Sequence, residues 1–103
     1  RGGEVEEIIP AMFVGSWTGN FIGFNAGTRT IIIEANGTMK YGEVTLVAEY
    51  DIAKSQIVGK NADKSYVITL TWDAKNEVMS ANIVFVQDYS DEYNSSCSDL
   101  KKA

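Results

Sequence analysis

The stretch that decides the fold is TIIIEANGTMKYG, residues 30–42. Its consecutive isoleucines, Ile31 to Ile33, favour an extended strand over a helix, because β-branched side chains pack well on a pleated surface. Asn36-Gly37 then supplies the residues that a type I′ turn needs, since both central positions of that turn take a positive φ. The segment from Thr38 to Gly42 reads as the returning strand. We therefore predict a β-hairpin with a type I′ turn at this place.

The same organisation extends along most of the chain. Short runs of apolar and β-branched residues are separated by Gly, Asn and Asp, which favour turns. The predicted strands cover residues 15–24, 28–35, 38–42, 43–50, 55–60, 65–72 and 77–89. The last two carry apolar stripes of period two that should face each other, Tyr66, Ile68, Leu70 and Trp72 on one strand and Met79, Ala81, Ile83 and Phe85 on the other.

No amphipathic helix is long enough to cover an open sheet, so the meander can bury its apolar face by closing on itself. We expect an all-β fold, an antiparallel meander of about seven to eight strands that closes into a small barrel. A short helical turn should begin near Pro10, and Gly19 and Gly23 should mark a sharp bend or a close backbone approach in the first strand. Residues 1–103 would form a single domain, with a flexible arm over 1–9 and a polar C-terminal tail over 90–103.

Composition narrows the classes of partner. The 103 residues include nine Lys and Arg against fourteen Asp and Glu, a net charge of −5, and the basic residues are scattered. A nucleic-acid partner is therefore not expected, since binding a polyanion needs clustered cations. No apolar run reaches the length of a membrane span. Two Asn-x-Ser/Thr sequons, at Asn36 and Asn94, are compatible with secretion, so we expect a secreted, periplasmic or cell-surface protein.

Catalytic groups are few. The chain has no His, which excludes Ser-His and Cys-His nucleophile systems. Its single Cys97 lies in the predicted tail and is expected to be an exposed thiol without a disulfide partner inside the chain. Most of the carboxylates fall at strand ends or on polar faces, as solvated charges do. We predict no enzyme activity, no cofactor and no metal site.

Gly15-Ser16-Trp17, after a short helical turn, and the Asn36-Gly37 hairpin together resemble the calycin group, which comprises lipocalins, fatty-acid-binding proteins and avidins. The resemblance implies a small lipocalin-like barrel in which a short 3₁₀ turn precedes the Gly-x-Trp motif and plugs one end. The motifs support the resemblance over residues 10–42, and the regular spacing of the predicted strands supports it over the remainder of the chain. The lipocalin pattern also has an Arg near the last strand, which this chain lacks, and Arg29 lies too early to replace it.

The barrel and its aromatic stripes predict a non-enzymatic protein that binds a small apolar or amphipathic ligand at one mouth. The residues expected to line that site are Tyr41, Tyr50, Tyr66, Leu70, Trp72 and Phe85. The alternative is a protein-interaction or structural module with a filled core, which would act on a protein partner through its surface or its acidic tail. A barrel of about eight strands is near the boundary between a filled interior and room for one small ligand, so both readings stay open.

Overall fold

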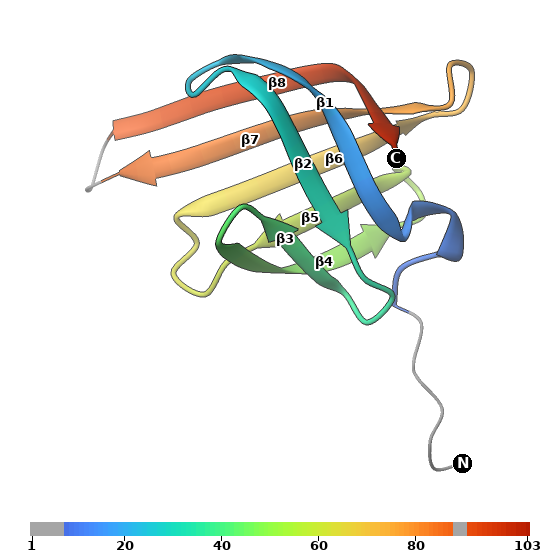
Figure 1. Ribbon diagram of the computed structural model, residues 1–103. Coiled ribbons are helices and arrows are strands. Elements are labelled where there is room, and N and C mark those ends of the chain that lie inside the picture. Colours follow the sequence, from blue (N-terminus) through green and yellow to red (C-terminus); the bar gives the residue numbers. More distant parts are fainter. Residues whose placement is uncertain (1–7, 88–90) are drawn as a thin grey trace.

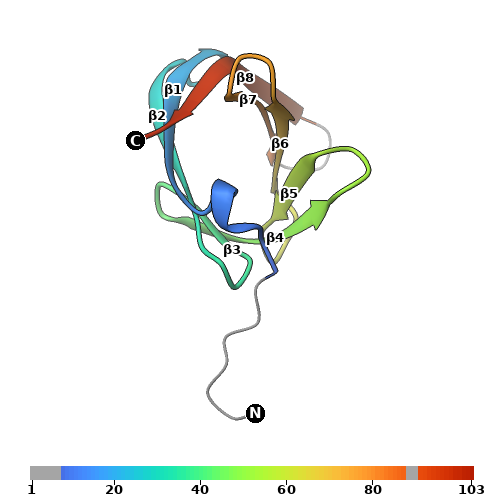
Figure 2. The ribbon, with the colours of Figure 1, turned by 90° about the vertical axis from the view of Figure 1, so that its right-hand side faces the viewer.

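The computed structural model describes residues 8–87 and 91–103, and in it one ribbon of eight antiparallel strands closes into a barrel (Figures 1 and 2). The elements are a 3₁₀ turn, Ala11–Phe13, and the strands β1 Gly15–Gly23, β2 Gly27–Ile33, β3 Thr38–Tyr41, β4 Val44–Asp51, β5 Gln56–Lys60, β6 Tyr66–Asp73, β7 Val78–Gln87 and β8 Asp91–Lys102. Each strand pairs with the next, and β1 pairs with β8 to close the ring. The predicted meander, its closure and its short helical turn are confirmed. Neither described range contains a helix with the length and apolar character needed to cross a membrane.

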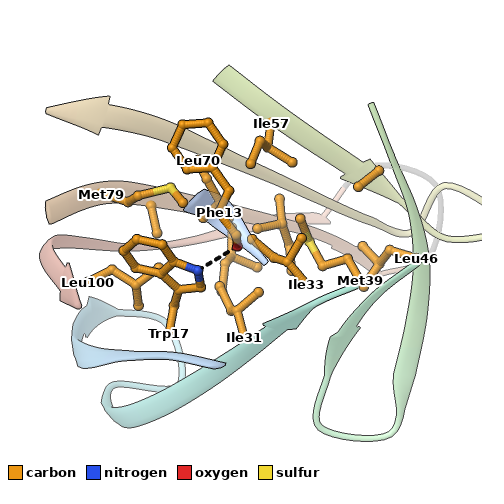
Figure 3. Close-up of a cluster of buried hydrophobic side chains, with 14 of the residues drawn as sticks. Phe13, Trp17, Ile31, Ile33, Met39, Leu46, Ile57, Leu70, Met79 and Leu100 are labelled. Atoms are coloured by element: carbon orange, nitrogen blue, oxygen red, sulfur yellow. Dashed lines mark hydrogen bonds between the residues drawn. The ribbon is translucent and has the colours of Figure 1, made fainter. Parts of the chain in front are cut away.

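Side chains alternate between the inside and the outside of the barrel. The stripes predicted on β6 and β7 face each other in register, through the pairs Tyr66–Phe85, Ile68–Ile83, Leu70–Ala81 and Trp72–Met79. Further inward residues, among them Ile31, Ile33, Met39 and Leu46, join one continuous apolar core (Figure 3). The period of two in the sequence therefore decides which residues become the core.

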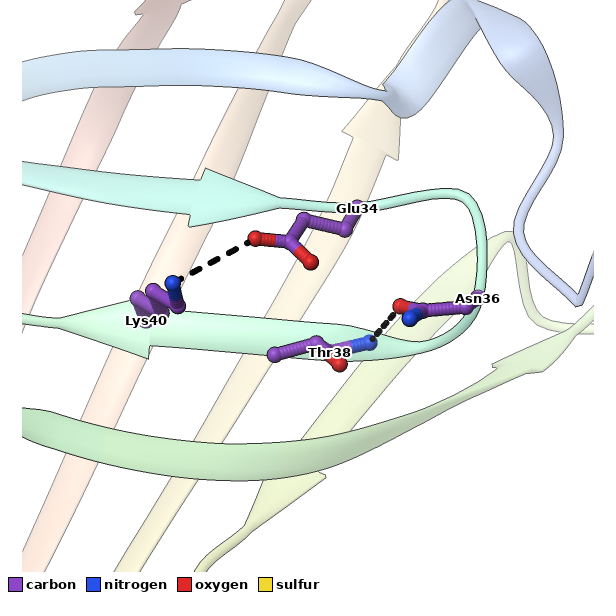
Figure 4. A network of polar contacts seen from close by, with 4 residues as sticks. All are labelled: Glu34, Asn36, Thr38 and Lys40. Carbon is purple, nitrogen blue, oxygen red and sulfur yellow. Dashed lines mark hydrogen bonds and ion pairs between the residues drawn. The ribbon is translucent and has the colours of Figure 1, made fainter.

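The hairpin predicted at residues 34–38 is present, but its type I′ turn is not. The N–H of Gly37 donates to the Glu34 carbonyl over 3.0 Å, and the N–H of Glu34 donates to the Thr38 carbonyl over 2.8 Å. Gly37 has a φ of +93°, whereas the φ of Asn36 is not positive, so the loop is a type I turn followed by a glycine bulge. The Asn36 side chain accepts a 2.9 Å hydrogen bond from the N–H of Thr38 instead, and an ion pair of 3.5 Å joins Lys40 to Glu34 (Figure 4).

The end of the barrel where β1 begins and β8 ends, the closed end, is plugged by the 3₁₀ turn (Figure 2). Phe13 in this turn is buried, and its carbonyl accepts a 2.8 Å hydrogen bond from Nε1 of Trp17 (Figure 3). Lys102 places its Nζ 5.8 Å from the centroid of the Trp17 ring and donates to the Met12 carbonyl over 2.9 Å. A cation from the last strand thus lies over the ring of Trp17.

The polar tail predicted over 90–103 is wrong for residues 91–102, which form β8. The inward residues Ser95, Cys97 and Leu100 are only 7%, 4% and 0% exposed, so Cys97 is a buried thiol and not an exposed one. A β-carbon at Gly19 would lie 2.5 Å from the Cys97 Sγ and 3.2 Å from the Leu100 Cα. The close approach predicted at Gly19 is therefore confirmed, and it explains why β8 carries small inward side chains.

Seven of the nine residues in the predicted arm lie outside the described residues. The other two, Ile8 and Ile9, belong to the fold. Their N–H groups both donate to the Ala35 carbonyl, over 3.0 and 3.2 Å, and the side chain of Ile9 is fully buried. The arm prediction is thus wrong at its last two positions, where an apolar side chain is anchored beside the β2–β3 loop.

Candidate functional site

The structure divides the six predicted ligand-binding residues between the two ends of the barrel. Tyr50 and Trp72 lie at the closed end, with ring centroids 5.6 and 5.7 Å from that of Phe13. Trp72 also meets Trp17 edge to face, at 6.3 Å. Leu70 is fully buried in the core between the two ends. These three residues pack the plug and the interior.

Tyr41, Tyr66 and Phe85 come together at the opposite, open end, where two further rings join them. We call this group of five residues the aromatic rim: Phe24, Tyr41, Tyr66, Phe85 and Tyr93. Its shortest centroid distances are 4.4 Å between Phe24 and Tyr93 and 4.6 Å between Tyr66 and Phe85. Tyr41 lies 6.1 Å from Tyr66, and Phe85 lies 6.2 Å from Tyr93. Four strand ends and the β1–β2 turn thus place stacked and tilted rings around one opening.

The aromatic rim surrounds a small pocket whose floor includes Ile83 and Ser95. The pocket has a volume of about 30 Å³, which is room for a water molecule and far below the several hundred Å³ of a typical small-molecule site. Phe24 is 42% exposed and lies on the β1–β2 turn, where Asn25 takes a φ of +58°. It is the rim ring with the least surrounding packing, so a ligand would enter most easily by displacing it.

A notch in the barrel wall lies beside the rim. β2 has seven residues and β3 has four, and β3 pairs only with residues 31–33 of β2. Residues 27–30 of β2 therefore have β1 as a neighbour on one side and an open groove of about 600 Å³ on the other. Tyr41, Tyr66 and the Gly42-Glu43 turn line the far side of this groove, which we call the notch.

Arg29 is the charged residue on the β2 side of the notch. It shares the inward phase of Ile31 and Ile33, and its guanidinium reaches the β1–β2 turn. Nη2 donates to the main-chain and side-chain oxygens of Asn25, each over 2.9 Å, and Nε donates to the same Asn25 carbonyl over 3.3 Å. None of these bonds uses Nη1, which remains available to the Tyr41 oxygen or to another acceptor.

Tyr41 stands across the notch from Arg29. Burial raises the pKa of the Tyr41 hydroxyl above its ordinary value of 10.0, the charge of Arg29 opposes that rise, and Tyr66 adds to it. At neutral pH the hydroxyl is therefore a neutral phenol that can donate a hydrogen bond. The notch thus combines one permanent cation with at least one hydroxyl donor, which is the chemistry that recognises an oxyanion.

Other reactive groups are not assembled. Within residues 8–87 and 91–103, His, Cys, Asp and Glu side chains form no group of three that could hold a metal ion. Burial raises the pKa of the Cys97 thiol, whose Sγ also donates to Asp99 over 3.2 Å, and a protonated, buried thiol is a poor nucleophile.

Known proteins give no assignment for this arrangement. Comparison with protein-family models, curated proteins and solved structures found no match. The barrel itself is shown by the strand pairing, whereas the resemblance to calycins stays a prediction.

Three residues of the open end, Phe24, Tyr93 and Arg29, are missing from the predicted site. Phe24 and Tyr93 belong to segments that the sequence assigns to a strand end and a tail, so no stripe includes them. Arg29 has the same inward phase as Ile31 and Ile33, and a charged residue on a predicted core face is the pattern that could have identified it.

Proposed function

We propose that this protein binds a small apolar or amphipathic molecule at the open end of the barrel, between the rings of the aromatic rim. The observation that carries the proposal is the gathering of five aromatic side chains from separate elements around one pocket, while the closed end is plugged. Fold-level likeness to calycins points to the same class of function and adds only an analogy.

The energetics favour a flat ligand. Each 100 Å² of apolar surface that ligand and rim remove from water contributes about 2.5 kcal/mol, and stacked or edge-to-face rings add about 0.5–1.5 kcal/mol per pair. Because the pocket measures about 30 Å³, part of this gain is spent on moving the Phe24 ring aside. A single aromatic ring system fits these conditions better than a long acyl chain, since the apolar core beneath the pocket is filled by side chains.

The test uses N-phenyl-1-naphthylamine, a neutral dye whose emission rises in apolar surroundings. The wild-type protein should bind it saturably. Ile83→Ala enlarges the pocket from below, because Ile83 is 3% exposed and lines the pocket. We expect this variant to bind the dye about tenfold more tightly, a gain of about 1.4 kcal/mol.

Ile57→Ala is the matched control. Ile57 is 1% exposed and does not line the rim pocket, so the same truncation should cost similar stability and leave dye binding unchanged. The proposal is refuted if neither the wild type nor Ile83→Ala binds the dye. It is refuted equally if both alanine variants change binding to the same extent, since that would reflect a loosened core.

A further inference from the structure

We infer that an extended peptide segment of a partner protein binds in the notch, as an added β-strand that pairs with Thr28 and Thr30 along the free edge of β2. The inference goes beyond the proposed function and does not depend on it, because it rests on main-chain groups in the barrel wall and not on the pocket of the aromatic rim. The strand pairing itself shows which of these groups are open.

The alternation of the backbone decides which groups of β2 face the notch. In an antiparallel pair, the N–H and C=O of one residue point to one side of the strand, and those of the next residue point to the other side. The N–H of Glu34 bonds to the Thr38 carbonyl, on the side of β3. Ile32, Thr30 and Thr28 therefore present their main-chain groups to the same side as Glu34.

The pairing of β1 leads to the same assignment. The Ser16 carbonyl accepts a 2.8 Å hydrogen bond from the N–H of Ala103, just after β8, so residues in the phase of Ser16 bond toward β8 and those in the phase of Trp17 bond toward β2. Trp17 lies opposite Ile31. The residues of β2 in the phase of Ile31 therefore bond to β1, and the other phase is left for β3 and the notch.

Strand β3 is too short to use these groups. It pairs only with residues 31–33 and ends at Tyr41, because Gly42 takes a φ of +59° and the chain turns back into β4 (Figure 1). In the described part of the chain, Gly42 makes no main-chain hydrogen bond to Thr30. The N–H and C=O groups of Thr28 and Thr30 thus face the notch at the two-residue spacing of a strand edge, and an extended peptide can pair with all of them.

The shape of the notch favours a loose segment over a second copy of the barrel. Tyr41, Tyr66 and the β3–β4 turn line the side opposite β2, and the space between the two sides measures about 600 Å³. A folded sheet edge is too wide to enter between two walls, and each of two copies would hold its free edge behind its own β3–β4 turn. An extended terminus or loop of about three residues, about 10 Å long, covers Thr28 to Thr30.

The surroundings also indicate which side chains this segment carries. A strand in line with β3 and antiparallel to β2 places one residue opposite Arg29, facing inward beside Tyr41 and Tyr66. An aromatic side chain suits this position, because it can stack on the guanidinium and on the rings. The two flanking residues face outward, where β-branched side chains pack well beside threonine. Lys40 and Glu43 line the notch with opposite charges, so a segment without net charge is favoured.

The experiment follows the isotope-labelled full chain by NMR while the capped peptide acetyl-Gly-Ser-Thr-Tyr-Thr-Ser-Gly-amide is added. The peptide should bind saturably. In the free protein the amide protons of Thr28 and Thr30 should exchange rapidly with solvent, and saturating peptide should slow their exchange about tenfold or more. The amide protons of Arg29 and Ile31 should be protected in both states, because they bond to β1.

N-methylation of the peptide supplies a control that leaves the protein unchanged. A methyl group on the nitrogen of either peptide threonine removes a donor aimed at β2 and should lower affinity about fivefold or more. A methyl group on the nitrogen of the peptide tyrosine, which faces away from β2, should change affinity by about twofold at most.

A pair of protein variants makes the same comparison from the side of β2. Thr30→Pro removes the N–H that faces the notch and spares the ladder with β1, so it should weaken peptide binding about fivefold or more. Thr30→Val loses the same side-chain bond to Thr18 and keeps the N–H, so it should bind like the wild type. Absence of saturable binding, slow exchange of the Thr28 and Thr30 amides in the free protein, or equal effects of the three methyl groups would overturn the inference. Dye binding tests the proposed function separately.

Discussion

Replacing Leu100 with alanine should cost the barrel about 3–4 kcal/mol of unfolding free energy. Leu100 is fully buried on β8, and the change removes the equivalent of about three methylene groups, worth about 2.4 kcal/mol in transfer free energy. A cavity term is added because the site cannot collapse. A β-carbon at Gly19 would lie only 3.2 Å from the Leu100 Cα, so the two backbones are already in close contact.

Urea denaturation followed by the emission of Trp17 and Trp72 measures this loss. The urea midpoint should fall while the slope of the transition stays constant, and the melting temperature should fall by about 12–25 °C. Lys101→Ala is the matched control, because Lys101 is the exposed neighbour on the same strand and its loss should change stability by less than about 0.5 kcal/mol. Equal midpoints for the two variants would refute the place of β8 in the barrel.

Other substitutions test separate contacts. Gly19→Ala should lower the free energy of unfolding by about 1–3 kcal/mol, because the added β-carbon overlaps the Cys97 sulfur. Adding Cys97→Ala should recover part of that loss. Strictly additive changes in urea melts would contradict the contact. Trp17→Phe should lower the free energy of unfolding. In a Lys102→Met background this loss should be smaller by about 0.5–1 kcal/mol, which is the contribution of a cation–π contact. An equal loss in both backgrounds would argue against that contact. Since burial raises the Tyr41 pKa above 10.0 in the folded state, the unfolded chain ionises first and stability declines as the pH rises past that value. Tyr41→Phe should lessen this decline in urea melts at about pH 9 and about pH 11, and an identical decline would exclude Tyr41 as its source.

The architecture could be predicted wherever the side chains alternate clearly. The alternation of apolar residues alone predicts that the stripe from Tyr66 to Trp72 faces the stripe from Met79 to Phe85. The observed strand register confirms this pairing. The sequence predicts the position of the turn at Asn36-Gly37 correctly and its type wrongly. Local sequence marks where a chain reverses, whereas the loop length depends on how the two strands are aligned in the sheet.

Strand β8 could not be predicted because the size of its inward side chains depends on the neighbouring strand β1. Its inward positions Ser95 and Cys97 are small and carry polar atoms, as in a loop. A β-carbon at Gly23 would lie 3.2 Å from the Ser95 Cα, and one at Gly19 would lie 2.5 Å from the Cys97 Sγ. Small residues are required there by a partner strand far away in the chain, and no local window contains that information.

The assignment of β8 to a tail also made the predicted site incomplete. Tyr93 lies on β8, so its assignment to a tail removed it from the open end. Tyr50 and Trp72 share the stripe phase of the rim residues but lie at the opposite ends of their strands. Alternation shows which face a residue occupies, and the position along the barrel axis requires the strand registers.

Closure by the first and last strands has a consequence for how the protein is made. Lys102 bonds to a carbonyl 90 positions earlier, so the ring cannot be sealed until β8 has left the ribosome. Until then β1 presents an unpaired edge, and pairing across such a distance is slow. The nascent chain is therefore most open to aggregation before β8 emerges, and a product that ends before Asp91 would remain unsealed.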